Sequence, residues 1–277
     1  MNSSLNTGVS ALRSFTEGLE VIGNNIANVN TSGYKKSRAD YGDNFYQLLK
    51  QPSNGGGASV TMQSQQQVGG GVQVAGISTH FQTESFEYTG NETDLAISGN
   101  GFFRLIDPSS NQPYYTRAGA FHFDSTGYLV NTDGFRLQGS SGMVQIMATP
   151  DAQIANYGAE VVSFAFAPKT GTLQAVLTNN ETVDIGQVRL SHFTDPQGLM
   201  RQGGTVYTAT STAGTRTDFL PGNGEIATVD SQYLEASNVD LTEEFANMIT
   251  TQRSFQGAAR IITTADQILQ EAVNLKR

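Results

Sequence analysis

Hydrophobic residues in the first thirty positions repeat with helical spacing. Two rows of apolar side chains recur every seven residues: Leu5, Leu12, Leu19 and Ile26, followed by Phe15, Ile22 and Val29. This a/d pattern predicts a helix of about 25 residues with one apolar seam. The segment Thr31-Ser32-Gly33 is a typical glycine stop signal, so the helix is expected to end near it.

The end of the chain carries a longer series of the same kind. Its spacings alternate between four and three residues: Leu241, Phe245, Met248, Gln252, Phe255, Ala259, Ile262, Asp266, Leu269 and Val273. Asp240 followed by Glu243 has the spacing of a capping box, so a helix should begin there and continue nearly to Arg277. Gln252 and Asp266 are polar, and a polar group in a packed seam favours a role in fixing register against a partner helix.

The two terminal helices can pair with each other within one chain, and this simplest arrangement stays open. However, Ile249, Ile261 and Ile268 lie off the main stripe, so the C-terminal helix has more apolar surface than one partner covers. We therefore expect contacts with further chains. The candidate assembly interface consists of Leu5, Leu12, Phe15, Leu19, Ile22, Ile26, Val29, Leu241, Phe245, Met248, Ile249, Phe255, Ile262, Leu269 and Val273.

Between the helices, apolar residues come in short runs bounded by Gly, Asn, Asp or Pro. Examples are residues 95–97, 101–105, 121–123, 128–130 and 183–193. Strand-like runs separated by turns at this frequency predict a mainly-β domain. The predicted fold class is therefore α+β, with coiled-coil-like helices at both ends flanking an inserted mainly-β domain.

The predicted domain organisation has three parts. Residues 1–33 and 237–277 form a terminal helical assembly domain, residues 34–71 an extended linker rich in Gly and Gln, and residues 72–236 the β-rich domain.

The composition of the linker favours a passive tether. Its apolar residues Val60, Met62 and Val68 nevertheless provide side chains that could contact neighbouring subunits in an assembly.

Composition and charge exclude several classes of function. Charged residues make up 15% of the 277 residues and the net charge is -9, so a broad basic surface for nucleic acid is not expected. The absence of cysteine excludes disulfides, thiolate metal sites and cysteine nucleophiles. The start of the chain lacks a basic segment followed by an apolar run, and no run of 18 apolar residues occurs, which disfavours Sec export and membrane insertion.

Candidate catalytic chemistry is sparse, and no cofactor or metal is expected. His80, His122 and His192 are far apart in sequence and lack metal-ligand spacing, so a structural role is favoured for each. Asp94 and Asp107 are the carboxylate pair that a β-rich glycoside hydrolase would need. The absence of Trp weakens this enzyme hypothesis, and a turn or cap role is favoured for both aspartates.

Motifs at both ends of the chain resemble those of a known family. Residues 22–35, Ile-Gly-Asn-Asn-Ile-Ala-Asn-Val-Asn-Thr-Ser-Gly-Tyr-Lys, resemble the N-terminal signature of flagellar rod and hook proteins. Residues 237–241, 247–249 and 252–253 resemble their C-terminal signature, and residues 93–103 and 115–119 resemble the family in the middle. The resemblance thus extends over nearly the whole chain.

Membership of this family implies a non-enzymatic structural subunit. The resemblance implies export in an unfolded state through the flagellar type III apparatus and assembly at the growing tip into a helical tube. The implied partners are copies of the same chain, neighbouring flagellar axial proteins and junction proteins. The terminal helices would become ordered as they pack together in the innermost layer of the tube.

The resemblance favours two positions along the flagellum. Residues 255–256, 260–264 and 273–277 resemble short hook proteins, which predicts a hook subunit that transmits motor torque to the filament outside the cell. Residues 44–52 and the long linker instead resemble the distal rod, the drive shaft of the periplasm-spanning basal body. The hook is the main expectation and the distal rod the alternative.

Overall fold

The computed structural model describes residues 2–50, 66–140, 142–144, 161–179, 181–222 and 226–275. These residues form two compact units. The described residues within Met1–Ala27, Ser37–Thr79 and Val239–Arg277 make up the first unit, and those within Asn28–Lys36 and His80–Asn238 make up the second. Two terminal helices accompany a mainly-β region, which confirms the α+β class.

The two long helices of the first unit begin and end close to their sequence signals. Helix α3 (Leu241–Asn274) starts at the predicted cap, where the Asp240 side chain accepts hydrogen bonds from the backbone amides of Thr242 and Glu243. Helix α1 (Asn2–Ala27) ends before the glycine signal, so Val29 lies beyond the helix rather than in its seam. Gly33 itself has a φ of 69° in the second unit, where an added Cβ would lie 2.5 Å from the backbone nitrogen of Ala118.

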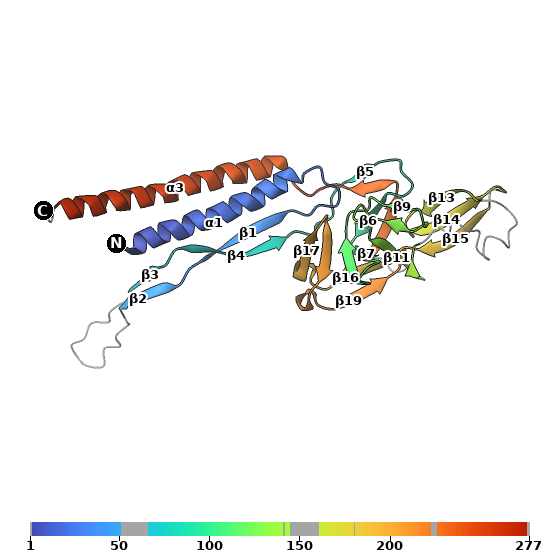
Figure 1. Cartoon of the computed structure of the whole chain (residues 1–277), viewed down its shortest axis with the longest axis horizontal. Helices are drawn as coiled ribbons and strands as arrows, with labels where there is room; N and C mark the ends of the chain where they lie inside the picture. Colours follow the sequence, from blue (N-terminus) through green and yellow to red (C-terminus); the bar gives the residue numbers. More distant parts are fainter. Residues whose placement is uncertain are drawn as a thin grey trace, which may run out of the picture. The chain divides into compact units, whose positions relative to one another are not determined.

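Helix α1 is the middle layer of the first unit. It packs on one side against α3 and on the other against a two-stranded antiparallel ribbon of β1 (Ser37–Asp43) and β4 (Val72–Thr79), as Figure 1 shows. The Tyr41 hydroxyl of β1 lies so near the helix that a Cβ on Gly18 would be 1.9 Å from it. The glycine therefore allows the close approach of the ribbon.

Part of the predicted linker is paired β-structure. Within residues 34–71, β2 (Tyr46–Lys50) pairs with β3 (Gln66–Gly69), and β1 pairs with β4, which follows the predicted linker. Residues 72–79, predicted as the start of the β-rich domain, belong to the first unit. These pairings use backbone hydrogen bonds between distant segments, which a local search for apolar runs cannot detect. Val60 and Met62 lie outside the described residues, and Val68 is an exposed residue of β3.

The second unit is built around a ten-stranded sheet. Its main path runs through β17 (Leu199–Gly203), β18 (Val206–Ala209), β8 (Pro113–Thr116), β7 (Phe102–Ile106), β11 (Arg136–Gly139), β10 (Leu129–Val130) and β9 (His122–Phe123). Three further strands join it: β12 (Gly142–Met143) beside β11, β16 (Leu190–Phe193) beside β7, and β19 (Arg216–Phe219) beside β16.

Smaller sheets complete the second unit. A three-stranded sheet contains β13 (Val161–Ala167), β14 (Thr172–Leu177) and β15 (Thr182–Gln187). Two antiparallel pairs are β20 (Ala227–Ser231) with β6 (Leu95–Gly99), and β21 (Tyr233–Glu235) with β5 (Phe86–Tyr88). Two short 3-10 helices are η1 (Pro196–Gly198) and η2 (Ser211–Ala213).

Strand β7 contributes to two hydrophobic clusters of the second unit. Phe103 and Leu105 belong to the larger cluster, with residues such as Leu95 and Leu190. Phe102 belongs to the smaller one, with residues such as Tyr207. Successive side chains of a strand point to opposite faces of a sheet, so the pair Phe102-Phe103 places an aromatic ring in each cluster. Burial on both faces explains why apolar residues stand at four of the five positions of this strand, with Arg104 as the exception.

Neither of the long helices in the described part of the chain combines the length and the hydropathy that crossing a membrane requires.

Candidate assembly surface

The row of α3 side chains that faces α1 follows a heptad spacing. Its residues are Glu244, Met248, Thr251, Phe255, Ala258, Ile262, Ala265 and Leu269, all of them buried or half-buried. The predicted seam shares Met248, Phe255, Ile262 and Leu269 with this row. At the other positions Thr251, Ala258 and Ala265 are buried or half-buried, whereas the predicted Gln252 and Asp266 are exposed; the predicted Ala259 is half-buried beside Ala258.

Small side chains allow close packing of α1 and α3 along this row. A Cβ on Gly8 of α1 would lie 2.8 Å from Cγ1 of Ile262, so the two helices are in close contact there. Ala258 and Ala265 permit such an approach, whereas longer side chains at these positions would hold the helices apart. Gln252 and Asp266 are both exposed, and Asp266 accepts a hydrogen bond from the Gln270 amide nitrogen at 2.9 Å. The structure therefore does not place these polar groups in the seam with α1.

Asn25 joins three elements of the first unit. Its Nδ2 atom donates to the Ser37 carbonyl oxygen at 2.8 Å and to Oε2 of Glu244 at 3.2 Å. Its Oδ1 atom accepts from the Ser37 amide at 3.0 Å. Asn25 and Glu244 are both nearly inaccessible to solvent, so the hydrogen bonds satisfy polar groups that would otherwise be costly to bury. The amide thus fixes the end of α1 against β1 and the start of α3.

The predicted interface residues differ in how much of them is exposed. On α1, the predicted residues within the helix are all half-buried: Leu5, Leu12, Phe15, Leu19, Ile22 and Ile26. On α3, several large apolar side chains are exposed, from 39% for Leu241 to 67% for Val273, and Leu275 just after the helix is 88% exposed. Large apolar side chains of the first unit are also exposed outside α3, among them Phe45, Tyr46 and Ile77, so α3 carries one part of its surplus apolar surface.

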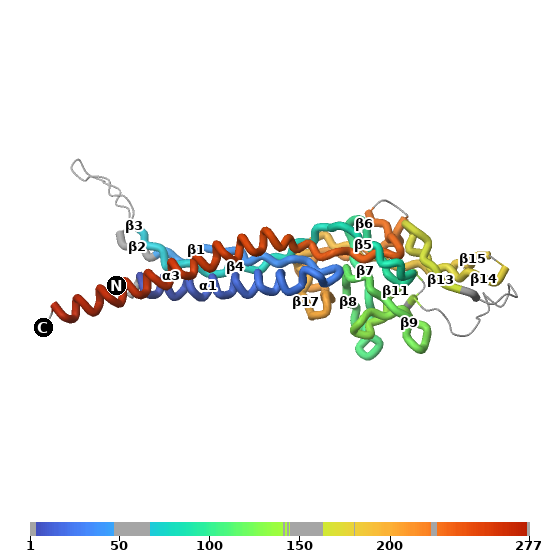
Figure 2. Tube along the Cα trace, turned by 90° about the horizontal axis from the view of Figure 1, so that it is seen from above, coloured from blue at the N-terminus to red at the C-terminus, as the bar shows by residue number. Residues whose placement is uncertain are grey.

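The exposed apolar residues of α3 lie on two different sides of the helix. Leu241, Phe245 and Ile249 follow one another along one side near its start, and Ile261 and Ile268 lie along another side in its second half. Val273 and Leu275 lie near its end, where α3 extends past the start of α1, as Figures 1 and 2 show. Exposure of these apolar side chains to water is unfavourable in an isolated chain. We therefore take α3 as the candidate assembly surface.

A buried ionic cluster holds the segments that follow α1 and precede α3. Lys35 Nζ lies 2.6 Å from Oε1 of Glu235, and Arg117 Nη1 lies 3.3 Å from Oε2 of the same carboxylate. Lys35 also donates to the Gln82 carbonyl oxygen at 2.5 Å. Burial lowers the pKa of Lys35 below its usual value, and the charge of Glu235 opposes this shift. The cluster has no local sequence signal, because its members are far apart in the chain.

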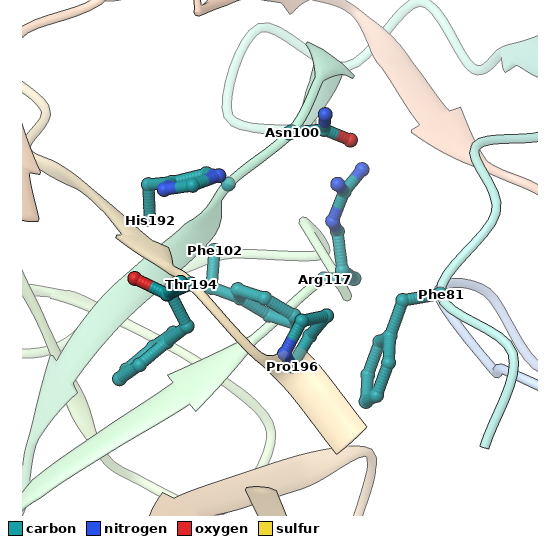
Figure 3. A pocket seen from close by; sticks show the side chains of 9 residues that line it. Phe81, Asn100, Phe102, Arg117, His192, Thr194 and Pro196 are labelled. Carbon is teal, nitrogen blue, oxygen red and sulfur yellow. The ribbon is translucent and has the colours of Figure 1, made fainter. Parts of the chain in front are cut away.

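A small pocket of about 200 Å³ lies beside this cluster in the second unit. Its lining residues are Phe81, Asn100, Gly101, Phe102, Arg117, His192, Phe193, Thr194 and Pro196. The Arg117 guanidinium extends toward Asn100, and the rings of Phe81 and Pro196 lie farther along the wall (Figure 3). Arg117 donates to the Gly99 carbonyl oxygen at 2.7 Å as well as to Glu235, so it supports the surrounding loops.

Asp94 and Asp107, the two carboxylates of the enzyme hypothesis, each accept hydrogen bonds within their own turn. Asp94 accepts hydrogen bonds from the Thr89 hydroxyl at 2.6 Å and the Asn91 amide at 3.2 Å. Asp107 accepts from the Ser110 hydroxyl and the Ser109 amide, which lower its pKa. Both aspartates therefore have the turn roles favoured by the sequence. Among the described residues, no group of three His, Asp or Glu side chains is arranged to hold a metal ion.

Comparison with known proteins matches three parts of the chain to profiles of flagellar proteins. Residues 5–35 match one described as "Flagella basal body rod protein". Residues 96–172 match "Flagellar hook protein FlgE/F/G D1 domain", and residues 230–275 match "Flagellar basal body rod FlgEFG protein C-terminal".

Several individual proteins are similar over the whole length of the chain. The flagellar basal-body rod protein FlgG of Bacillus subtilis (strain 168) is 40% identical over 278 residues, which cover 100% of both chains. FlgG of Borreliella burgdorferi is 30% identical over 277 residues, again 100% of both. The flagellar hook protein FlgE of the same organism is 25% identical over an alignment of 447 residues that covers 100% of both.

Proposed function

This chain belongs to the family of flagellar rod and hook proteins, and we propose that within the family it is a subunit of the distal rod. Support comes from the rod proteins named FlgG, which are 40% and 30% identical over the full length, whereas the hook protein shares 25%. The comparisons thus favour the rod, which residues 44–52 indicated as the alternative. They favour the hook less, although it was the main expectation from the C-terminal residues.

The proposed activity is mechanical. Copies of the chain polymerise into a helical tube that spans the periplasm as the drive shaft of the basal body and carries motor torque. Such a tube needs heterologous contacts, in which one surface of a subunit meets a different surface of the next without closing a ring. The exposed apolar residues of α3 supply surfaces of this kind, and no catalytic residue is required.

The proposed route and partners follow from the family. The chain leaves the cell through the flagellar export apparatus, and it contacts copies of itself and neighbouring axial proteins. The paired strands β1 to β4 add contacts to adjacent subunits, which limit bending and keep the tube straight. In this proposal Val68, exposed on β3, is one of the contacting side chains.

Removal of residues 240–277 tests whether α3 drives polymerisation. The second unit has its own core, so the truncated chain should keep strand-type circular dichroism, and it should form no sedimentable tubes. Phe245→Ser should weaken tube formation while the monomer stays folded, since the Phe245 side chain is 49% exposed. Tyr88→Ser is the matched control, because it removes an exposed aromatic ring from the second unit.

Tube formation by the truncated chain, to the same extent as by the full chain, would contradict this role of α3. An equal loss of assembly in Tyr88→Ser and Phe245→Ser would also contradict it.

A further inference from the structure

The small pocket of the second unit combines a buried cation with aromatic walls. Arg117, which lines it, is 2% exposed, and its guanidinium extends toward Asn100 (Figure 3). Phe81, Phe102 and Phe193 form part of the same lining. Every lining residue belongs to the second unit, so the site needs no contact between the units.

Arg117 has a hydrogen-bond donor that the described residues leave unpaired. Its Nη2 atom donates to the Gly99 carbonyl oxygen at 2.7 Å. Its Nη1 atom lies 3.3 Å from Oε2 of Glu235, and 3.5 Å from acceptors on Thr83 and Ile97. Its Nε atom is buried and has no hydrogen-bond partner among the described residues. A buried donor without an acceptor is unfavourable, so this guanidinium has the capacity for one more acceptor.

The buried cluster behind the pocket has one carboxylate for two basic side chains. Glu235 contacts both Lys35 and Arg117. Glu84 also acts on the charge of Lys35, but Glu84 is exposed, and solvent screens an exposed charge. A second negative charge close to Arg117 would therefore be favourable, and the pocket is the space beside Arg117 that can hold one.

The aromatic walls limit which anion fits. The ring centroid of Phe102 lies 5.3 Å from that of Phe81 and 6.0 Å from that of Phe193. An inorganic anion would have no favourable contact with these rings, whereas an aromatic or compact aliphatic body would pack against them. The pocket has a volume of about 200 Å³. A cavity of roughly 150 Å³ holds one benzene molecule, so a ring that carries a carboxylate fits.

We propose that this pocket binds a small monocarboxylate with an apolar body of about the size of one ring. The carboxylate accepts hydrogen bonds from the Arg117 guanidinium, and Asn100 and His192 supply further N–H donors in the lining. The body of the ligand packs against Phe81 and Phe102. This inference adds a ligand site to a chain whose proposed role is mechanical, and it does not depend on polymerisation.

Calorimetric titration of the full-length chain tests the class of ligand, with benzoate as the probe. Benzamide has the same ring without the charge, and acetate has the charge without the ring. Benzoate should bind in a saturable way with one site per chain. Benzamide and acetate should each bind at least about tenfold more weakly, because each lacks one of the two groups of contacts.

A substitution at the exposed residue Asn100 tests the location of the site. Asn100→Asp adds a carboxylate to the lining and should weaken benzoate binding at least about fivefold by repulsion. Asn111→Asp is the matched control, because Asn111 is an exposed residue that follows β7 whereas Asn100 precedes this strand. It should change the affinity by less than about twofold. Circular dichroism checks that both variants are folded.

Three results would overturn the proposed site. Benzoate that shows no saturable binding contradicts it outright, and benzamide or acetate that binds as tightly as benzoate contradicts the class of ligand. Equal effects of Asn100→Asp and Asn111→Asp would place benzoate outside this pocket. None of these results bears on tube formation, so the proposed function would stand in each case.

Discussion

Glu235 determines the charge balance of the buried cluster in the second unit. Its carboxylate contacts both Lys35 and Arg117, and all three side chains are almost fully buried. Loss of its charge leaves two cations buried without this partner, whereas loss of Lys35 leaves the pair of Glu235 and Arg117. The two substitutions should therefore differ strongly in cost.

We predict that Glu235→Gln lowers the free energy of unfolding of the second unit by roughly 3–5 kcal/mol. Lys35→Met should cost clearly less, because it also removes a charge whose burial is unfavourable. Urea unfolding followed by circular dichroism measures both values. An equal or larger loss in Lys35→Met would show that the lysine, rather than the carboxylate, stabilises the cluster.

Residue-level prediction from the sequence succeeded where the signal is local. The cap at Asp240 and the turn roles of Asp94 and Asp107 depend on groups within a few residues, and each is present in the structure. The contact of Lys35 with Glu235 joins positions 200 residues apart, and no residue near either one in sequence indicates the pairing. Such pairs become visible only when the fold brings the segments together.

At the scale of elements, the hydrogen bonds of Asn25 fix how α1 meets α3. Asn25→Asp would replace the donor to Glu244 with a second carboxylate, and two buried carboxylates in contact repel each other. We predict a loss of roughly 3 kcal/mol in the stability of the first unit. Adding Glu244→Gln places a donor opposite the new carboxylate and should recover at least about 1 kcal/mol.

Denaturant unfolding of the two single variants and the double variant measures this coupling. Strict additivity of the two changes would mean that Asn25 and Glu244 stabilise the first unit independently. Ser37 also contacts Asn25, so full recovery in the double variant is not expected.

The elements themselves were predicted more reliably than their contacts. Periodicity identified both long helices and the β-rich middle, because those signals repeat over many residues. The sequence left open which partner the apolar stripe of α3 contacts, and the structure divides that stripe: Met248 and Ile262 are half-buried, whereas Phe245 is exposed. The pairing of β1 with β4 was missed because β1 is polar and lacks an apolar pattern.

At the scale of the whole molecule, the chain passes between its two units four times. It leaves the first unit after Ala27 and returns to it after Lys36. It leaves again after Thr79 and returns after Asn238. A load carried by the helices therefore reaches the second unit through four covalent connections. The Asn25 contacts and the Lys35–Glu235 pair lie near three of these passages, where they hold the connecting segments in place.

The shape of the polymer tests the assignment to the distal rod most directly. Electron microscopy of tubes assembled from the purified full-length chain records their curvature in the absence of other flagellar proteins. The proposed drive shaft predicts straight, stiff tubes, because contacts from strands β1 to β4 to adjacent subunits limit bending. Tubes that are uniformly curved, as a flexible hook would be, would contradict the rod assignment.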